Sequence, residues 1–69
     1  MARLVVSTKY GMTHEAEVRD VREARHEVER FRRTYLSNHQ RDAIADMCVV
    51  DRFGNIVSRM RNGDLEDFS

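Results

Sequence analysis

The chain has no proline, only three glycines and only one cysteine among its 69 residues. The scarcity of proline and glycine excludes collagen-like or linker character, and a single cysteine cannot form an internal disulfide bond. The sequence has no apolar run of the ~18 residues that a membrane-spanning helix needs. The amino-terminal segment 1–9 has too short an apolar stretch for a signal peptide. We therefore expect a protein of the cytoplasm, with its cysteine reduced.

The residues that are present predict one small folded domain over residues 1–69. Hydrophobic residues make up 41% of the chain and charged residues 35%, and 12 basic side chains balance 12 acidic ones. These proportions are typical of folded chains rather than disordered ones. A chain of this length buries only about 60% of the surface that its unfolded form exposes, so a second domain is excluded.

The first third of the sequence favours a β-hairpin. Leu4, Val6 and Thr8 alternate with Val5, Ser7 and Lys9 in a run rich in β-branched residues. Gly11 can take the positive φ of a turn, and residues 15–19 alternate strictly between polar and apolar. The alternative is one long helix over residues 13–36, since glutamate and arginine are good helix formers and neither glycine nor proline interrupts the stretch. We predict the hairpin.

A helix is predicted from about Val21 to Leu36. Asp20 can cap its start, and Glu23 three residues later completes a pattern like a capping box. Extending the helix backwards would bring Glu17 and His14 into the apolar stripe, which favours a start at Val21. The stripe consists of Val21, Ala24, Val28, Phe31 and Tyr35.

A second hairpin is predicted from residues 45–50 and 56–60, joined by a turn over residues 51–55 with aspartate first and glycine fourth. If Asp51 pairs with Asn55, Val50 faces Ile56 and Val49 faces Val57. One sheet face then carries Cys48, Val50, Ile56 and Met60, and the other carries Met47, Val49 and Val57 with Arg59 and Arg61. The expected fold is α+β, a small antiparallel sheet packed by one amphipathic helix in the order ββαββ.

One helix can cover only one of these two faces. We place Cys48 in the core, because a free cysteine among apolar neighbours packs as a small hydrophobe. The other face, with Met47, Val49 and Val57, is then predicted to mediate self-association, most simply as a homodimer. Residues 62–69 form an acidic tail that is too short for an independent element, and it either frays or covers that face through Leu65 and Phe68.

The sequence contains no pattern that predicts catalysis, a cofactor or a metal site. His26-Glu27 begins like a zinc-protease helix, but the second histidine of that motif is replaced by Arg30. The histidines and Cys48 include no closely spaced ligand pair, and the apolar neighbours of Cys48 raise a thiol pKa rather than produce a nucleophile. We expect no enzyme activity.

Charge is segregated along the chain even though its sum is zero. Residues 19–41 carry seven arginines against four acids, whereas residues 42–69 carry three arginines against six acids. One strip of the predicted helix, opposite the apolar stripe, carries Arg19, Arg22, His26, Arg30 and Arg33, which we call the arginine ridge.

The arginine ridge and Phe53, at the tip of the second hairpin, are the predicted partner-binding residues. The expected partner is another protein with an acidic surface. Nucleic acid is the second choice, because the net charge is zero and the aromatic residues do not form a stacking pattern. The plainer alternative is a solvated helix face with ion pairs such as Arg19–Glu23.

Segments 17–36 (EVRDVREARHEVERFRRTYL) and 47–60 (MCVVDRFGNIVSRM) resemble small phage and prophage proteins in which one helix lies on an antiparallel sheet, among them anti-CRISPR proteins. The resemblance lies in element order over residues 15–61, so it transfers no functional residue. It implies a stoichiometric inhibitor that acts by covering a surface of its partner.

Overall fold

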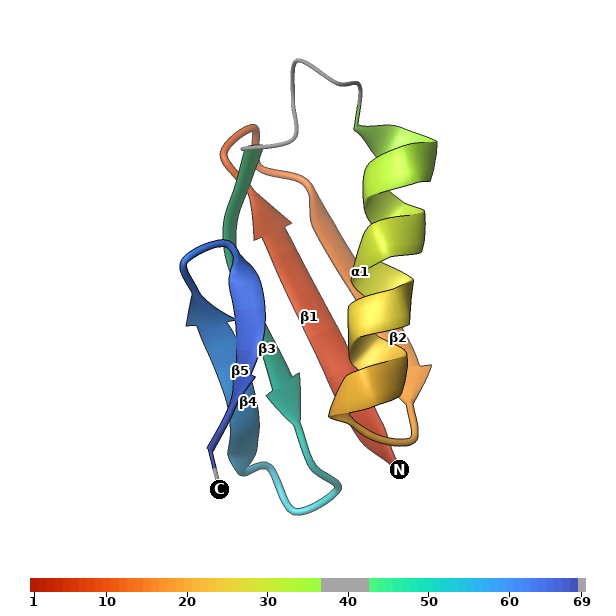
Figure 1. Cartoon of the computed structure of the whole chain (residues 1–69), viewed down its shortest axis with the longest axis vertical. Coiled ribbons are helices and arrows are strands. Elements are labelled where there is room, and N and C mark those ends of the chain that lie inside the picture. Colours follow the sequence, from red (N-terminus) through yellow and green to blue (C-terminus); the bar gives the residue numbers. More distant parts are fainter. Residues whose placement is uncertain (37–42, 69) are drawn as a thin grey trace.

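The computed structural model describes residues 1–36 and 43–68. The elements within these ranges are β1 (Ala2–Thr8), β2 (Thr13–Val18), α1 (Val21–Tyr35), β3 (Ile44–Val50), β4 (Ile56–Arg61) and β5 (Asp64–Asp67). The strands form one antiparallel sheet in the order β2-β1-β3-β4-β5, with α1 on one face (Figure 1). The predicted α+β class is confirmed, but the order is ββαβββ rather than ββαββ.

The amino-terminal hairpin is confirmed, and the long-helix alternative is wrong. Leu4 pairs with Ala16 and Val6 with His14 across β1 and β2. Gly11 has a φ of 86° in the connecting turn, a conformation that glycine adopts without steric cost.

Helix α1 begins and ends close to the predicted limits. The Asp20 side chain accepts a hydrogen bond of 2.8 Å from the backbone N–H of Glu23, which satisfies one of the free amides at the helix start. Ala24, Val28 and Phe31 are buried against the sheet. The backbone at Leu36 is extended, so the helix ends at Tyr35. Residues 37–40 are all polar, so the sequence favours a loop there, and they lie outside the described residues.

The predicted acidic tail, residues 62–69, contains the edge strand β5. Asn62 and Gly63 both have positive φ, 54° and 86°, which is the geometry of a tight two-residue hairpin turn. Leu65 pairs with Met60 of β4 and is only 4% exposed, so it belongs to the core. Four residues suffice for a strand here because β4 supplies the hydrogen-bonding partner.

The predicted assignment of sheet faces is wrong. Met47 and Val49 are 2% and 0% exposed beneath α1, and Val57 packs against the same core. Cys48 is half-buried on the opposite face. These three residues therefore do not form an uncovered face for a second copy of the chain, and self-association through another surface stays a prediction.

A β-bulge explains why the later residues of β4 were assigned to the wrong face relative to β3. Val50 pairs with Ile56 as predicted, but the register then shifts, so that Val49 pairs with Ser58 and Cys48 with Arg59. One extra residue in a strand reverses the faces of all residues beyond it. Met60 therefore faces the helix, and Arg59 faces the open side of the sheet.

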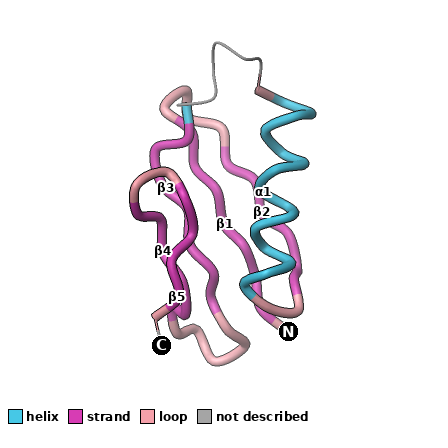
Figure 2. Tube along the Cα trace, in the orientation of Figure 1, coloured by secondary structure: helices cyan, strands magenta, loops and turns pink. Residues whose placement is uncertain are grey.

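Four segments meet at one end of the molecule, which we call the hairpin end. Both ends of the described chain, the β2–α1 connection and the β3–β4 turn lie there, as Figure 2 shows. The residues that define it are Met1, Arg19, Asp20, residues 51–55 and Phe68. The β1–β2 turn and the last turn of α1 lie at the opposite end (Figure 1).

Candidate interaction surface

The structure places the whole arginine ridge on the outer side of α1 and its start. Arg19, Arg22, His26, Arg30 and Arg33 are all exposed. At about 1.5 Å per residue, the ridge extends for roughly 20 Å along the helix. Its two ends are therefore too far apart to contact one small group on a partner.

Helix carboxylates neutralise part of this ridge. Arg19 donates to Glu23 at 2.9 Å, one turn later, and Arg30 donates to Glu27 at 3.3 Å. The bond to Glu23 also raises the pKa of Arg19, so its guanidinium stays charged. Such exposed pairs contribute little to stability because water screens them, so both arginines can exchange their carboxylates for others.

Two other arginines have a role that the sequence pattern did not predict. Arg25 donates to the backbone carbonyl of Leu65 at 3.0 Å, and Arg32 donates to that of Gly63 at 2.9 Å. Arg25 also lies 3.7 Å from the carboxylate of Asp67. These contacts fasten β5 to the helix. The sequence does contain one signal for this role: the two arginines are seven residues apart, which places them on the same flank of the apolar stripe.

The β3–β4 turn is rigidly built. One carboxylate oxygen of Asp51 accepts hydrogen bonds from the backbone N–H groups of Phe53, at 2.8 Å, and Asn55, at 2.9 Å. These bonds, above all the one from Asn55, lower the pKa of Asp51. The backbone N–H of Asp51 donates to the carbonyl of Asn55 at 2.8 Å. The turn thus holds its tip in a defined position before any partner arrives.

Phe53 projects from this tip and is 74% exposed. The guanidinium of Arg52 lies over its ring, 4.8 Å from the ring centre, in a cation–π contact. A rigid turn therefore presents an apolar ring and a cation side by side.

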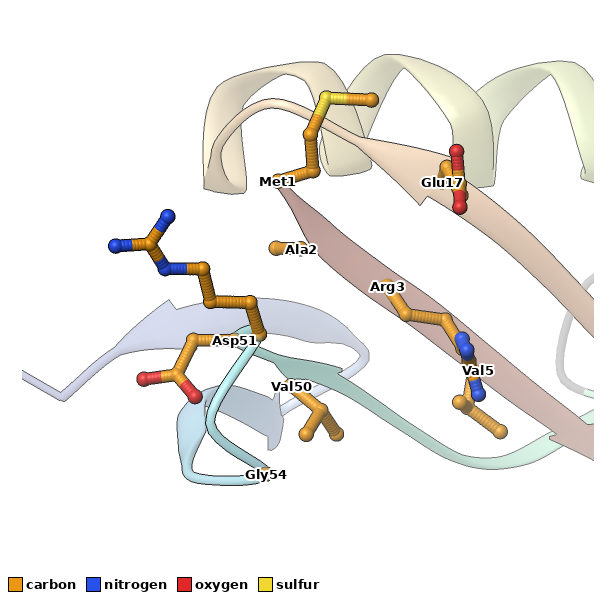
Figure 3. Close-up of a pocket in the computed structure, with 9 residues that line it drawn as sticks. Met1, Ala2, Arg3, Val5, Glu17, Val50, Asp51 and Gly54 are labelled. Atoms are coloured by element: carbon orange, nitrogen blue, oxygen red, sulfur yellow. The ribbon is translucent and has the colours of Figure 1, made fainter.

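Two depressions flank the start of β1 at the hairpin end. The larger, of about 500 Å³, is formed by the first residues of β1, by Glu17 of β2 and by the β3–β4 turn (Figure 3). The smaller, of about 370 Å³, lies between Met1, Arg19 and Phe53. Arg52 lines both depressions.

The hairpin end therefore brings together only part of the predicted partner-binding set. Arg19 and Phe53 line one depression, and Arg22 lies one residue into α1 from it. Arg30 and Arg33 belong to the last turns of the helix, toward the opposite end. Sequence reasoning missed Met1 and Arg52, which have no distinctive spacing and are assembled only by the sheet order.

His14, His26 and Cys48, which the structure describes, do not form a cluster. His14 lies 3.4 Å from Glu27 and stacks on Phe31, with 5.0 Å between ring centres, whereas His26 is exposed. Burial and the nearby Asp46 raise the pKa of the Cys48 thiol, which disfavours the thiolate. Within residues 1–36 and 43–68, no three side chains of the metal-binding types gather closely enough to hold an ion. His39 lies outside the described residues.

The fold and its surface define a small α+β protein with one helix on a five-stranded antiparallel sheet. Comparison with known proteins finds no family model, no curated protein and no solved structure that matches the chain. In the described part of the chain, the single helix is too short and too polar to cross a membrane.

Proposed function

We propose that this chain is a non-enzymatic interaction module that binds an acidic surface of another protein through its hairpin end. The observation that carries the proposal is the pairing of an exposed Phe53 ring with the Arg52 guanidinium on a rigid turn. An apolar anchor next to arginines is the composition that contributes most to protein–protein binding energy.

The surroundings of Phe53 support this choice. Met1 is 70% exposed beside the same depression, which gives the ring a neighbouring apolar side chain. Arg19 and Arg22 add positive charge at the start of α1, where it can steer an acidic partner toward the anchor. The module would then act by covering the surface that it binds, which requires no catalytic residue.

A nucleic-acid partner is the second candidate for the same cations. Single-stranded nucleic acid is usually bound by several aromatic rings in a row along a basic groove. Phe53 lines its depression with aliphatic side chains such as Met1, and the second exposed ring at the hairpin end, Phe68, does not line it. This composition favours a protein surface over stacked bases.

The proposal is tested by affinity capture from nuclease-treated lysate of the source cells, with the immobilised chain as bait and mass spectrometry as readout. We expect one acidic protein to be retained by the native chain and lost with Phe53→Ala or Arg52→Glu. Arg33→Glu, at the far end of the ridge, is the matched control and should retain it. The proposal is wrong if a partner is captured from a parallel untreated lysate but not from the nuclease-treated one, or if Phe53→Ala retains the partner unchanged.

Titration of the purified protein with labelled single-stranded and duplex DNA supplies the complementary measurement. A true nucleic-acid binder loses affinity steeply and linearly in log–log coordinates as salt rises, because counterions are released. We expect no such binding at physiological salt.

A further inference from the structure

The two edges of the sheet differ in how their backbone groups are used. The sheet order makes β2 one edge strand and β5 the other. An edge strand exposes a row of backbone N–H and C=O groups that can pair with another extended chain unless something blocks them.

The β5 edge is blocked by the helix. The carbonyls of Gly63 and Leu65 already accept hydrogen bonds from Arg32 and Arg25. β5 is also only four residues long. An incoming strand would have to displace both arginines before it could pair with this edge.

The β2 edge has no such cover among the described residues. The backbone N–H of Thr8 donates toward β2, to Met12 at 2.9 Å, and that of Lys9 donates toward β3, to Ala43 at 2.7 Å. Even-numbered residues of β1 therefore bond to their β2 partners, such as His14 and Ala16. By the same alternation, the backbone groups of Thr13, Glu15 and Glu17 point outward from the sheet.

The side chains at these positions select the strand that can bind. Glu15 and Glu17 are exposed on the open face, two residues apart. A second copy of β2 would set glutamates against glutamates, which destabilises strand pairing, whereas basic residues at alternate positions would form favourable cross-strand pairs. Arg3 of β1 lies 3.6 Å from Glu15 and offsets only part of this negative charge.

We propose that the outer edge of β2 binds an extended basic segment of a partner protein by strand addition. The backbone of Thr13, Glu15 and Glu17 forms the hydrogen bonds, and the two glutamates select lysine or arginine at every second position. Phe53 is not part of this surface, although Glu17 also lines the larger depression at the hairpin end, and the proposal does not depend on the proposed function of the hairpin end.

The test uses a capped peptide of sequence Thr-Lys-Val-Lys-Val-Lys-Thr and ¹⁵N-labelled protein, followed by NMR. We expect the Glu15 and Glu17 amide protons to exchange rapidly in the unbound protein, and to exchange more slowly, with saturable shifts along β2, when the peptide binds. The matched peptide with glutamate in place of lysine should not bind. A basic peptide N-methylated at its bonding amides should also fail, because strand addition needs those N–H groups.

Reversing the charges of Glu15 and Glu17 tests whether these two side chains select the peptide. The double variant Glu15→Lys/Glu17→Lys should bind the basic peptide roughly tenfold more weakly and should bind the glutamate peptide instead. Phe53→Ala should bind the basic peptide like the native chain, which separates this surface from the hairpin end. The proposal is overturned if the basic peptide does not bind at millimolar concentration, or if it protects the outward amides of β5 instead.

Discussion

Exposed aromatic rings lie at both ends of the molecule, and two of them, Tyr35 and Phe53, differ in what they contact. Tyr35, at the end of α1, lies 5.4 Å from the Phe31 ring and 6.3 Å from that of His14. Phe53, at the hairpin end, has the Arg52 guanidinium as its described ring contact. Tyr35 thus extends the core outward, whereas Phe53 stands on a turn that is rigid without it. Exposure alone therefore does not identify a binding residue. The contacts that an exposed ring already makes within the fold show whether it is available to a partner.

The largest expected effect comes from breaking the ring cluster at the Tyr35 end. Phe31→Ala should lower the free energy of unfolding by about 3–5 kcal/mol, because it removes a buried ring and leaves a cavity. Urea denaturation measures the change. Tyr35→Ala is the matched control and should cost much less, since that ring is over half exposed. Equal losses in the two variants would mean that Tyr35 carries the cluster, contrary to this account.

Leu65→Ala tests how β5 holds the carboxyl end of the chain at the hairpin end. We expect a loss of about 2–5 kcal/mol in the free energy of unfolding. The loosened strand should also lose the hydrogen bond of 3.0 Å from the Phe68 N–H to the carbonyl of Val57. Asp64→Ala, on the exposed side of the same strand, should change stability by no more than about 0.5 kcal/mol. A small loss for Leu65→Ala would show that β5 behaves as a tail after all.

Asp20→Ala tests how the start of α1 is held at the hairpin end, where Arg19 and Arg22 lie on either side of the cap. Loss of the cap should cost about 1 kcal/mol, measured by the same denaturation experiment, and should fray the first helical turn. Asp20→Asn keeps an oxygen acceptor and should remain close to the native stability. If both variants lose equally, the contribution of Asp20 lies in its charge rather than in the cap.

The smallest effect concerns the turn beneath Phe53. The pKa of Asp51 is lower in the folded chain than in the unfolded one, so its stabilising contribution is complete above about pH 4. It is lost as the pH falls through the lower folded-state value. Asp51→Asn should remove this acid dependence, which NMR shifts of Gly54 and Asn55 between pH 2 and pH 6 can follow. An unchanged pH profile in the variant would assign the titration to another carboxylate.

Local signals were sufficient to predict the two hairpins and the helix. The Asp20 cap and the Asp51 turn each lie within a few residues and form as predicted. Of the apolar stripe, Ala24, Val28 and Phe31 are buried as expected, whereas Tyr35 is 57% exposed. Phe53 is exposed at the tip of the Asp51 turn, where the sequence places it, and its role in binding stays a prediction. These features depend on residues that are close in sequence, so a local sequence pattern is enough to predict them.

Features set by neighbours distant in sequence were not predictable in the same way. Both faces of β3 are partly apolar, so its pattern could not show whether Met47 or Cys48 lies under the helix. The bulge beside Val50 leaves no mark in a run of β-branched residues. β5 is stabilised by β4 and by Arg25 and Arg32, about 30 to 40 residues earlier in the chain. The hairpin end combines four such separate segments, so only Arg19, Arg22 and Phe53 of it were predicted.

The most direct test of the central claim is photo-crosslinking from the two ends of the molecule. A benzophenone amino acid replaces Phe53 in one variant and Tyr10, in the β1–β2 turn, in the other, and both are irradiated in nuclease-treated lysate. The account predicts one protein adduct from position 53 that is abolished by adding Arg52→Glu, and none from position 10. An adduct of the same partner from position 10 alone would contradict it and place the binding surface at the opposite end.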